Sequence, residues 1–171
     1  MPVNEALSDF GKYLVKESRK NLTRKGKRDR GGLYDSLDYE VKVSKNSFEF
    51  TFLMEDYGAF QDQGVKGKTS SRKAPKSPFK FGTGTGKKGG LTKAMQSWVK
   101  RKGIRFRNRK SGQFMSYEST AFVIARSIYL TGIEPTRFYS RPFELGFKRL
   151  PNKVVEAYGL EIEKFLKQST K

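Results

Sequence analysis

Cysteine and histidine are both absent from the 171 residues of the chain, and these two absences exclude most familiar enzyme chemistry. Without cysteine there is no disulfide, no thiolate nucleophile and no cysteine-ligated zinc or iron–sulfur cluster. Without histidine there is no Ser–His or Cys–His nucleophilic pair, and the commonest metal ligand is missing. The sequence therefore predicts a protein that is not an enzyme and that holds neither metal nor cofactor.

Long apolar runs are absent as well. No stretch approaches the roughly 18 apolar residues of a membrane span, and residues 1–7 are polar, unlike a secretory signal peptide. Hydrophobic residues make up only 35% of the chain, but 14 Phe and 8 Tyr supply material for a modest core. We therefore predict a single domain over residues 1–171, made in the cytoplasm and without a membrane partner.

Acidic residues are missing from Gln63 to Tyr117, whereas residues 65–110 carry 16 of the 36 Lys and Arg. The formal charge of +19 therefore belongs mainly to this segment. A block of like charge repels itself and persists best where a polyanion, or the acidic surface of a neighbouring subunit, neutralises it. The alternative is a solvated loop that aids solubility; we favour the polyanion. The candidate contact residues are Arg72, Lys73, Lys76, Lys80, Lys87, Lys88, Arg101, Arg105, Arg107 and Arg109.

The spacing of apolar residues predicts an α+β fold. Three- and four-residue spacing indicates helices over 3–22, 119–130 and 152–168, whereas strict alternation indicates an antiparallel hairpin of 39–43 with 48–53. We expect the N-terminal and C-terminal helices to pack on this small antiparallel sheet. The three phenylalanines of the second strand are expected to form its buried face.

A basic insertion, residues 65–117, interrupts the predicted domain. It begins with a long Gly-rich loop, 64–90, which we expect to be mobile until it meets a partner. A short helix over 91–102 and a basic hairpin around 108–112 complete it. Beyond the helix that follows, the chain is predicted to be a loop through 138–143.

Three other patterns have structural interpretations. The G-x-G-x-x-G pattern at 84–89 is not preceded by a predicted strand, and no acidic residue follows at the distance where a dinucleotide site needs one to bind the ribose. We therefore assign it to the flexible loop. Aromatic or apolar residues alternate with Lys or Arg at 79–81 and 104–107. This pattern is typical of aromatic rings that stack on nucleobases, but also of a strand with a buried Phe face. We favour the strand for 104–107 and leave both interpretations open for 79–81. The acids near the hairpin match neither an EF-hand nor a metal nuclease, so we expect turn, cap and salt-bridge roles for them. They are Asp35, Asp38, Glu40, Glu55, Asp56 and Asp62.

Three short motifs, in order along the chain, resemble those of one phage protein family. Residues 31–37 (GGLYDSL) resemble its T-G-x-L-x-x-S-L element, 57–64 (YGAFQDQG) its Y-A-x-Y-V-E-x-G-T segment, and 139–143 (YSRPF) its x-R-P-F-L motif. The family comprises the neck or tail-completion proteins, also described as minor tail or head–tail connector proteins, of long-tailed lambda-like phages. The residues at motif positions are Gly32, Leu33, Ser36, Leu37, Tyr57, Gly58, Phe60, Gly64, Arg141, Pro142 and Phe143.

The resemblance implies a virion structural protein that forms a ring where the tail joins the head. Its implied partners are copies of itself, other neck, connector and tail proteins, and packaged DNA through its phosphates; it would assemble in the host cytoplasm and end in the virion. In such a ring, 65–110 either faces the DNA channel or reaches onto a neighbouring subunit. We favour the second, with Phe79, Phe81 or Trp98 as anchors. The alternative function is a sequence-nonspecific nucleic-acid-binding protein that uses 65–110.

Overall fold

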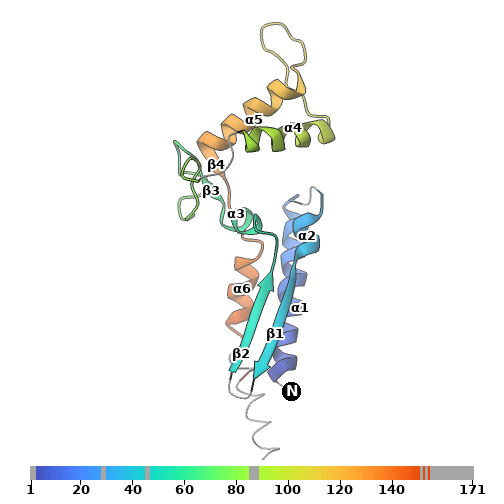
Figure 1. The fold of residues 1–171 in the computed structure, drawn as a ribbon, viewed down its shortest axis with the longest axis vertical. Coiled ribbons are helices and arrows are strands. Elements are labelled where there is room, and N and C mark those ends of the chain that lie inside the picture. The colour runs from blue at the N-terminus through green and yellow to red at the C-terminus, as the bar shows by residue number, and fades with distance from the viewer. Residues whose placement is uncertain are drawn as a thin grey trace, which may run out of the picture. The chain divides into compact units, whose positions relative to one another are not determined.

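The computed structural model describes residues 3–27, 30–44, 47–84, 89–150, 152 and 154. They belong to two compact units, whose elements are labelled in Figure 1. The first unit combines Met1–Asp62 with Thr136–Lys171, and the second is Gln63–Pro135. The second unit contains 17 of the 36 Lys and Arg but only two of the 17 acids, so the charge is segregated between the units.

The first unit is built of helices around a two-stranded sheet. Its elements are α1 (Val3–Arg24), α2 (Gly32–Ser36), β1 (Asp38–Ser44), β2 (Ser47–Leu53), α3 (Gly58–Gln63) and α6 (Ser140–Phe147). The predicted N-terminal helix and antiparallel hairpin are confirmed, with Val41 opposite Phe50 in the register. The α+β class of the chain is therefore confirmed.

Aromatic rings join α1, the hairpin and α6 into one core. The Phe10 ring of α1 lies 5.1 Å from Phe50 of β2 and 6.0 Å from Phe143 of α6. Gly11 allows α1 to approach β1, because a Cβ at this position would overlap the ring of Tyr39. A glycine that weakens the isolated helix is thus required by the packing of the folded unit.

Two expectations for the first unit are wrong. Phe48 is 44% exposed, and Phe50 and Phe52 are only half-buried, so the Phe face of β2 is not fully buried. Residues 138–143 are not a loop throughout, because α6 begins at Ser140. Pro142 lies in the first turn of α6, where a missing backbone N–H costs no helical hydrogen bond. The helix predicted over 152–168 lies outside the described residues except at 152 and 154.

The second unit pairs two helices and a short sheet. Its elements are β3 (Val65–Lys66), α4 (Gly90–Lys102), α5 (Tyr117–Thr131) and β4 (Gly132–Ile133). β3 pairs antiparallel with β4, and α4 packs against α5. The helices predicted over 91–102 and 119–130 are confirmed; Gly103 ends the first in the left-handed region and Ser116 caps the second.

The remaining parts of the basic segment are irregular. Residues 67–84 contain no helix, and a single parallel bridge joins Lys66 to Lys80. The expected mobility of the Gly-rich loop stays a prediction, although hydrogen bonds attach its first half to α5. The hairpin predicted around 108–112 is reduced to one antiparallel bridge, between Arg107 and Phe114.

Candidate functional site

The first two motif segments pack directly against each other in the first unit. Leu33 and Leu37 of the 31–37 segment are buried in one cluster with Leu22 and Phe138. Gly58 of the 57–64 segment lies against this cluster, because a Cβ there would come within 2.9 Å of the Leu33 Cδ1. The atoms nearest to this position are side-chain atoms of Leu33 and Met54, so a small side chain such as alanine would require only a slight shift of these two residues.

The second motif segment, 57–64, also forms hydrogen bonds with the third, 139–143. The Asp62 carboxylate is 3% exposed, and its Oδ1 accepts the backbone N–H groups of Tyr139 (2.9 Å) and Ser140 (3.1 Å). These N–H groups stand at the start of α6, where no helical carbonyl can bind them. Asp62 therefore acts as the cap of a helix that lies far away in the sequence, and a carboxylate is favoured there by the helix dipole.

Polar side chains complete the junction of the motifs. The Ser36 hydroxyl donates to the Leu33 carbonyl (3.0 Å) and accepts the Glu55 N–H (3.1 Å). Burial, with a smaller effect of the Glu55 charge, raises the pKa of Tyr57 above its ordinary value, although a backbone hydrogen bond at Leu33 opposes the shift. Burial and the Asp62 charge likewise raise the pKa of Tyr139.

The other motif residues differ in their exposure. Pro142 is buried and Phe143 is half-buried in the aromatic core, whereas Phe60 and Arg141 are exposed. Gly64 has a φ of +73° and belongs to the second unit, where it is buried. Apart from Gly64, the motif residues are thus gathered in the first unit, and most of them lie at one junction.

Replacement of Asp62 by Ala should destabilise the first unit by about 2 kcal/mol, because two partly buried N–H groups at the start of α6 lose their acceptor. Asp62→Asn keeps an acceptor oxygen and should retain most of the stability. Asp56→Ala, at an exposed carboxylate, should change the free energy of unfolding by less than about 0.5 kcal/mol. Urea unfolding followed by circular dichroism measures all three, and an Asp62→Ala variant as stable as Asp56→Ala would contradict the capping role.

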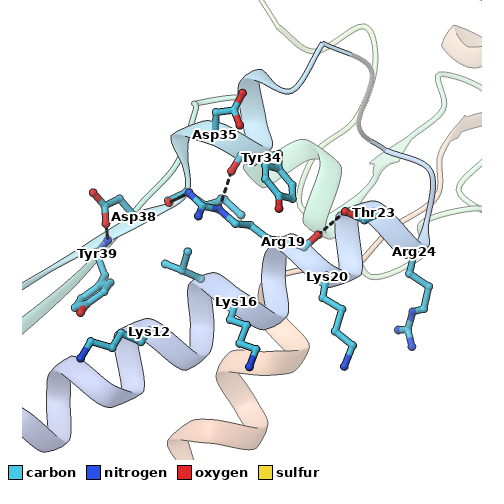
Figure 2. A pocket seen from close by; sticks show the side chains of 12 residues that line it. Lys12, Lys16, Arg19, Lys20, Thr23, Arg24, Tyr34, Asp35, Asp38 and Tyr39 are labelled. Atoms are coloured by element: carbon cyan, nitrogen blue, oxygen red, sulfur yellow. Dashed lines mark hydrogen bonds between the residues drawn. The ribbon is translucent and has the colours of Figure 1, made fainter.

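A basic groove of about 850 Å³ lies between α1 and the α2–β1 segment (Figure 2). Four of its cations recur at every fourth residue of α1 and project from the helix; they are Lys12, Lys16, Lys20 and Arg24. Val15, Leu37 and two tyrosines supply its apolar surface. This stripe was not predicted from the sequence because the denser charge of 65–110 dominated, although the four-residue spacing was a sufficient signal.

Arg19 fixes one wall of the groove. Its guanidinium donates to the carbonyls of Tyr34 and Leu37 at 3.1 Å each and lies 5.3 Å from the centre of the Tyr34 ring (Figure 2). The other cations repel one another along α1 at about 0.2–0.5 kcal/mol per neighbouring pair. Asp9 and Glu17 offset part of this, at 3.8 Å from Lys12 and 3.7 Å from Lys20. An acidic partner in the groove would offset the remaining repulsion between these cations.

The predicted polyanion contacts belong to the second unit, and those that the structure describes are exposed residues that it does not gather into one site. Arg72, Lys73 and Lys76 occupy the loop after β3. Arg101 belongs to the basic last turn of α4, and Arg109 lies in the turn that follows the Arg107 bridge. Lys80 alone lines a pocket, whose other residues were not predicted. Lys87 and Lys88 lie outside the described residues.

The segment 104–107 is not the strand with a buried Phe face that we expected. Phe106 and Phe114 are both exposed. The guanidinium groups of Arg105 and Arg107 lie 5.6 and 4.6 Å from the centre of the Phe114 ring, and Arg105 also lies 5.5 Å from the Tyr117 ring. Arginine–aromatic stacking therefore organises this end of the second unit.

The anchors proposed for bridging to a neighbour are used inside the second unit. Phe81 is half-buried, with its ring 5.8 Å from that of Tyr129 of α5. Phe79 and Trp98 are half-buried as well. Phe81 is thus engaged within its own unit, and the preference for bridging over contact with DNA stays a prediction.

Within the described residues, no group of three or more carboxylates is arranged to hold a metal ion. None of the helices in that part of the chain combines the length and the apolarity that crossing a bilayer requires. Comparisons of the chain with protein-family models, with curated proteins and with solved structures find no match. The function is therefore inferred from the residues and their geometry.

Proposed function

We propose that the chain is a virion structural protein: a ring-forming neck or tail-completion subunit that joins the phage tail to the head. One observation carries the proposal. Three motifs that resemble one protein family are widely separated in the sequence, yet Leu33 packs on Gly58 and Asp62 caps the helix of the third motif. Chance resemblance gives no reason for three short segments to support one another in the fold.

The two units suit two roles in such a ring. A closed ring needs a heterologous contact, in which different surfaces of neighbouring subunits meet. In the first unit the basic groove of α1 is one such surface. The exposed turn with Glu55, Asp56 and Tyr57 offers an acidic and aromatic complement that shares no residue with the groove. The second unit, with its excess of cations, is left to border the DNA channel.

Charge reversal tests this pairing of surfaces. Lys16→Glu with Lys20→Glu in the groove, or Glu55→Lys with Asp56→Lys in the turn, should each abolish ring formation, because like charges then meet at every contact. Each variant then presents complementary charge to the other at both surfaces, so a mixture of the two should assemble into oligomers in which the variants alternate. All four changes in one chain should restore the ring. Native mass measurement follows each state.

The control is Lys42→Glu with Lys148→Glu, two exposed lysines outside both surfaces, which should leave the ring intact. A ring that survives both surface variants would refute the assigned contact but not the ring itself. A wild-type chain that stays monomeric at every concentration would contradict the proposed function.

The second candidate is a sequence-nonspecific nucleic-acid-binding protein, monomeric or dimeric. The observation that favours it is the exposed Phe114 ring with the guanidinium groups of Arg105 and Arg107 close by, since bases stack on exposed aromatic rings while cations hold phosphates. The same mass measurement separates the candidates. A monomer whose DNA affinity falls steeply with salt supports the second candidate, and a closed ring supports the first.

A further inference from the structure

A pocket of about 350 Å³ opens beside β3 in the second unit. Three lysines and three hydroxyl side chains line it; they are Lys66, Lys68, Lys80, Thr69, Ser70 and Ser71. Among the described residues no acid lines it, and the second unit has only two acids, Glu118 and Glu134. The Glu118 carboxylate is already engaged, because it accepts the Gln96 side-chain amide at 3.1 Å.

The backbone forces two of these lysines together. The Lys66 N–H donates to the Phe79 carbonyl (2.8 Å), and the Phe81 N–H donates to the Lys66 carbonyl (2.9 Å). These two bonds form the parallel bridge that sets Lys66 beside Lys80. Two ammonium groups therefore start from neighbouring backbone positions, although their charges repel.

The loop that closes the pocket is fixed to helix α5. The Gly67 N–H donates to the Ser70 carbonyl and the Lys68 N–H to the Tyr129 carbonyl, both at 2.8 Å. The Thr69 hydroxyl donates to the Leu130 carbonyl at 3.0 Å. Because these bonds hold the loop before any ligand arrives, binding does not have to order it, and preorganisation of this kind strengthens binding.

The donors at the pocket suit an anion with several oxygen acceptors. Each lysine offers three N–H donors and no acceptor. The Ser70 hydroxyl oxygen accepts the Arg72 N–H at 3.3 Å, so its own proton is left to donate to a ligand. Lys68 lies with its Nζ 5.7 Å from the centre of the Tyr129 ring, which holds that side chain beside the pocket.

We infer that this pocket binds a phosphate group, and that the group belongs to a nucleic-acid backbone. The inference deepens the proposed function and rests on it only for the source of the phosphate. The surrounding unit favours a polymer, because its further cations can hold neighbouring phosphates of the same strand. The described lining of the pocket contains no Arg, Asn or Gln, the side chains that make the bidentate contacts typical of base reading, so we expect it to position DNA without reading sequence.

The test compares two triple variants with equal loss of charge. One carries Lys66→Gln, Lys68→Gln and Lys80→Gln; the matched control carries Lys93→Gln, Lys100→Gln and Lys110→Gln at exposed positions of the same unit. Affinity for a short DNA duplex of arbitrary sequence is measured over a series of salt concentrations. The slope of log K against log salt should fall by about 0.9 for each phosphate that the protein no longer neutralises, hence by about one for the pocket triple, whose three lysines hold one phosphate group, and by clearly less for the control.

Equal slopes for the two triples would overturn the inference, because diffuse charge would then account for binding. Titration with inorganic phosphate, followed by phosphorus NMR, separates the sources of the ligand. If the pocket triple no longer binds inorganic phosphate but binds DNA as the wild type does, the assignment to a nucleic-acid backbone is overturned. Native mass should show the same ring for both triples, so failure here is distinct from failure of the proposed function.

Discussion

Gly67→Ala should unfold the second unit or displace the loop after β3, with a loss of about 3 kcal/mol in the free energy of unfolding. A Cβ at Gly67 would overlap the carbonyl of Leu130, a backbone group that has no rotamer to escape into. Relief would require breaking the hydrogen bonds that attach residues 67–69 to α5. The loop therefore depends on glycine for its close approach to the helix.

Trp98, the only tryptophan, belongs to α4 and makes the measurement specific to the second unit. Its fluorescence during urea unfolding should show the destabilisation. The matched control is Gly84→Ala, because a Cβ there would meet no atom within 4 Å. It should change the free energy of unfolding by less than about 0.5 kcal/mol. Two variants of equal stability would refute the close approach of the loop after β3 to α5.

Phe50→Asp should cost the first unit about 3–5 kcal/mol, because an unpaired carboxylate would replace a ring of the core. The Phe50 ring lies 5.1 Å from Phe10 and 6.1 Å from Tyr39, so the change removes packing on both α1 and β1. Circular dichroism during urea unfolding reports on this helical and strand-containing unit.

The same strand supplies the control for this change. Phe48 alternates with Phe50 on β2 but is 44% exposed, and Phe48→Asp should cost less than about 1 kcal/mol. Equal effects of the two substitutions would mean that burial along β2 differs from the structure. A Phe50→Asp variant with unchanged stability would refute the core of the first unit.

Local patterns in the sequence were sufficient to predict the long elements. Apolar spacing located α1, α4 and α5, and alternation located β1 and β2, because these signals arise within each segment. Helix α6 was not predicted because its cap, Asp62, is 77 residues from Tyr139 in the sequence. A short helix with an internal proline has little signal of its own, and a long-range contact stabilises it.

The candidate sites likewise combine features that the sequence predicts with features that depend on contacts between distant segments. Composition alone indicated that 65–110 carries the charge, but not that hydrogen bonds to Phe79 and Phe81 would set Lys66 beside Lys80. The groove needed the placement of α2 over α1 by Arg19, which no pattern in the sequence expresses. Hydrogen bonds between separate segments therefore create both features, through the backbone at the pocket and through the Arg19 side chain at the groove.

We propose above that this chain joins phage tails to heads. Electron microscopy of particles assembled without the chain tests it most directly. We expect DNA-filled heads and finished tails that remain separate, and joined particles once the purified wild-type ring is added. Joined, infectious particles in the absence of the chain would contradict the claim.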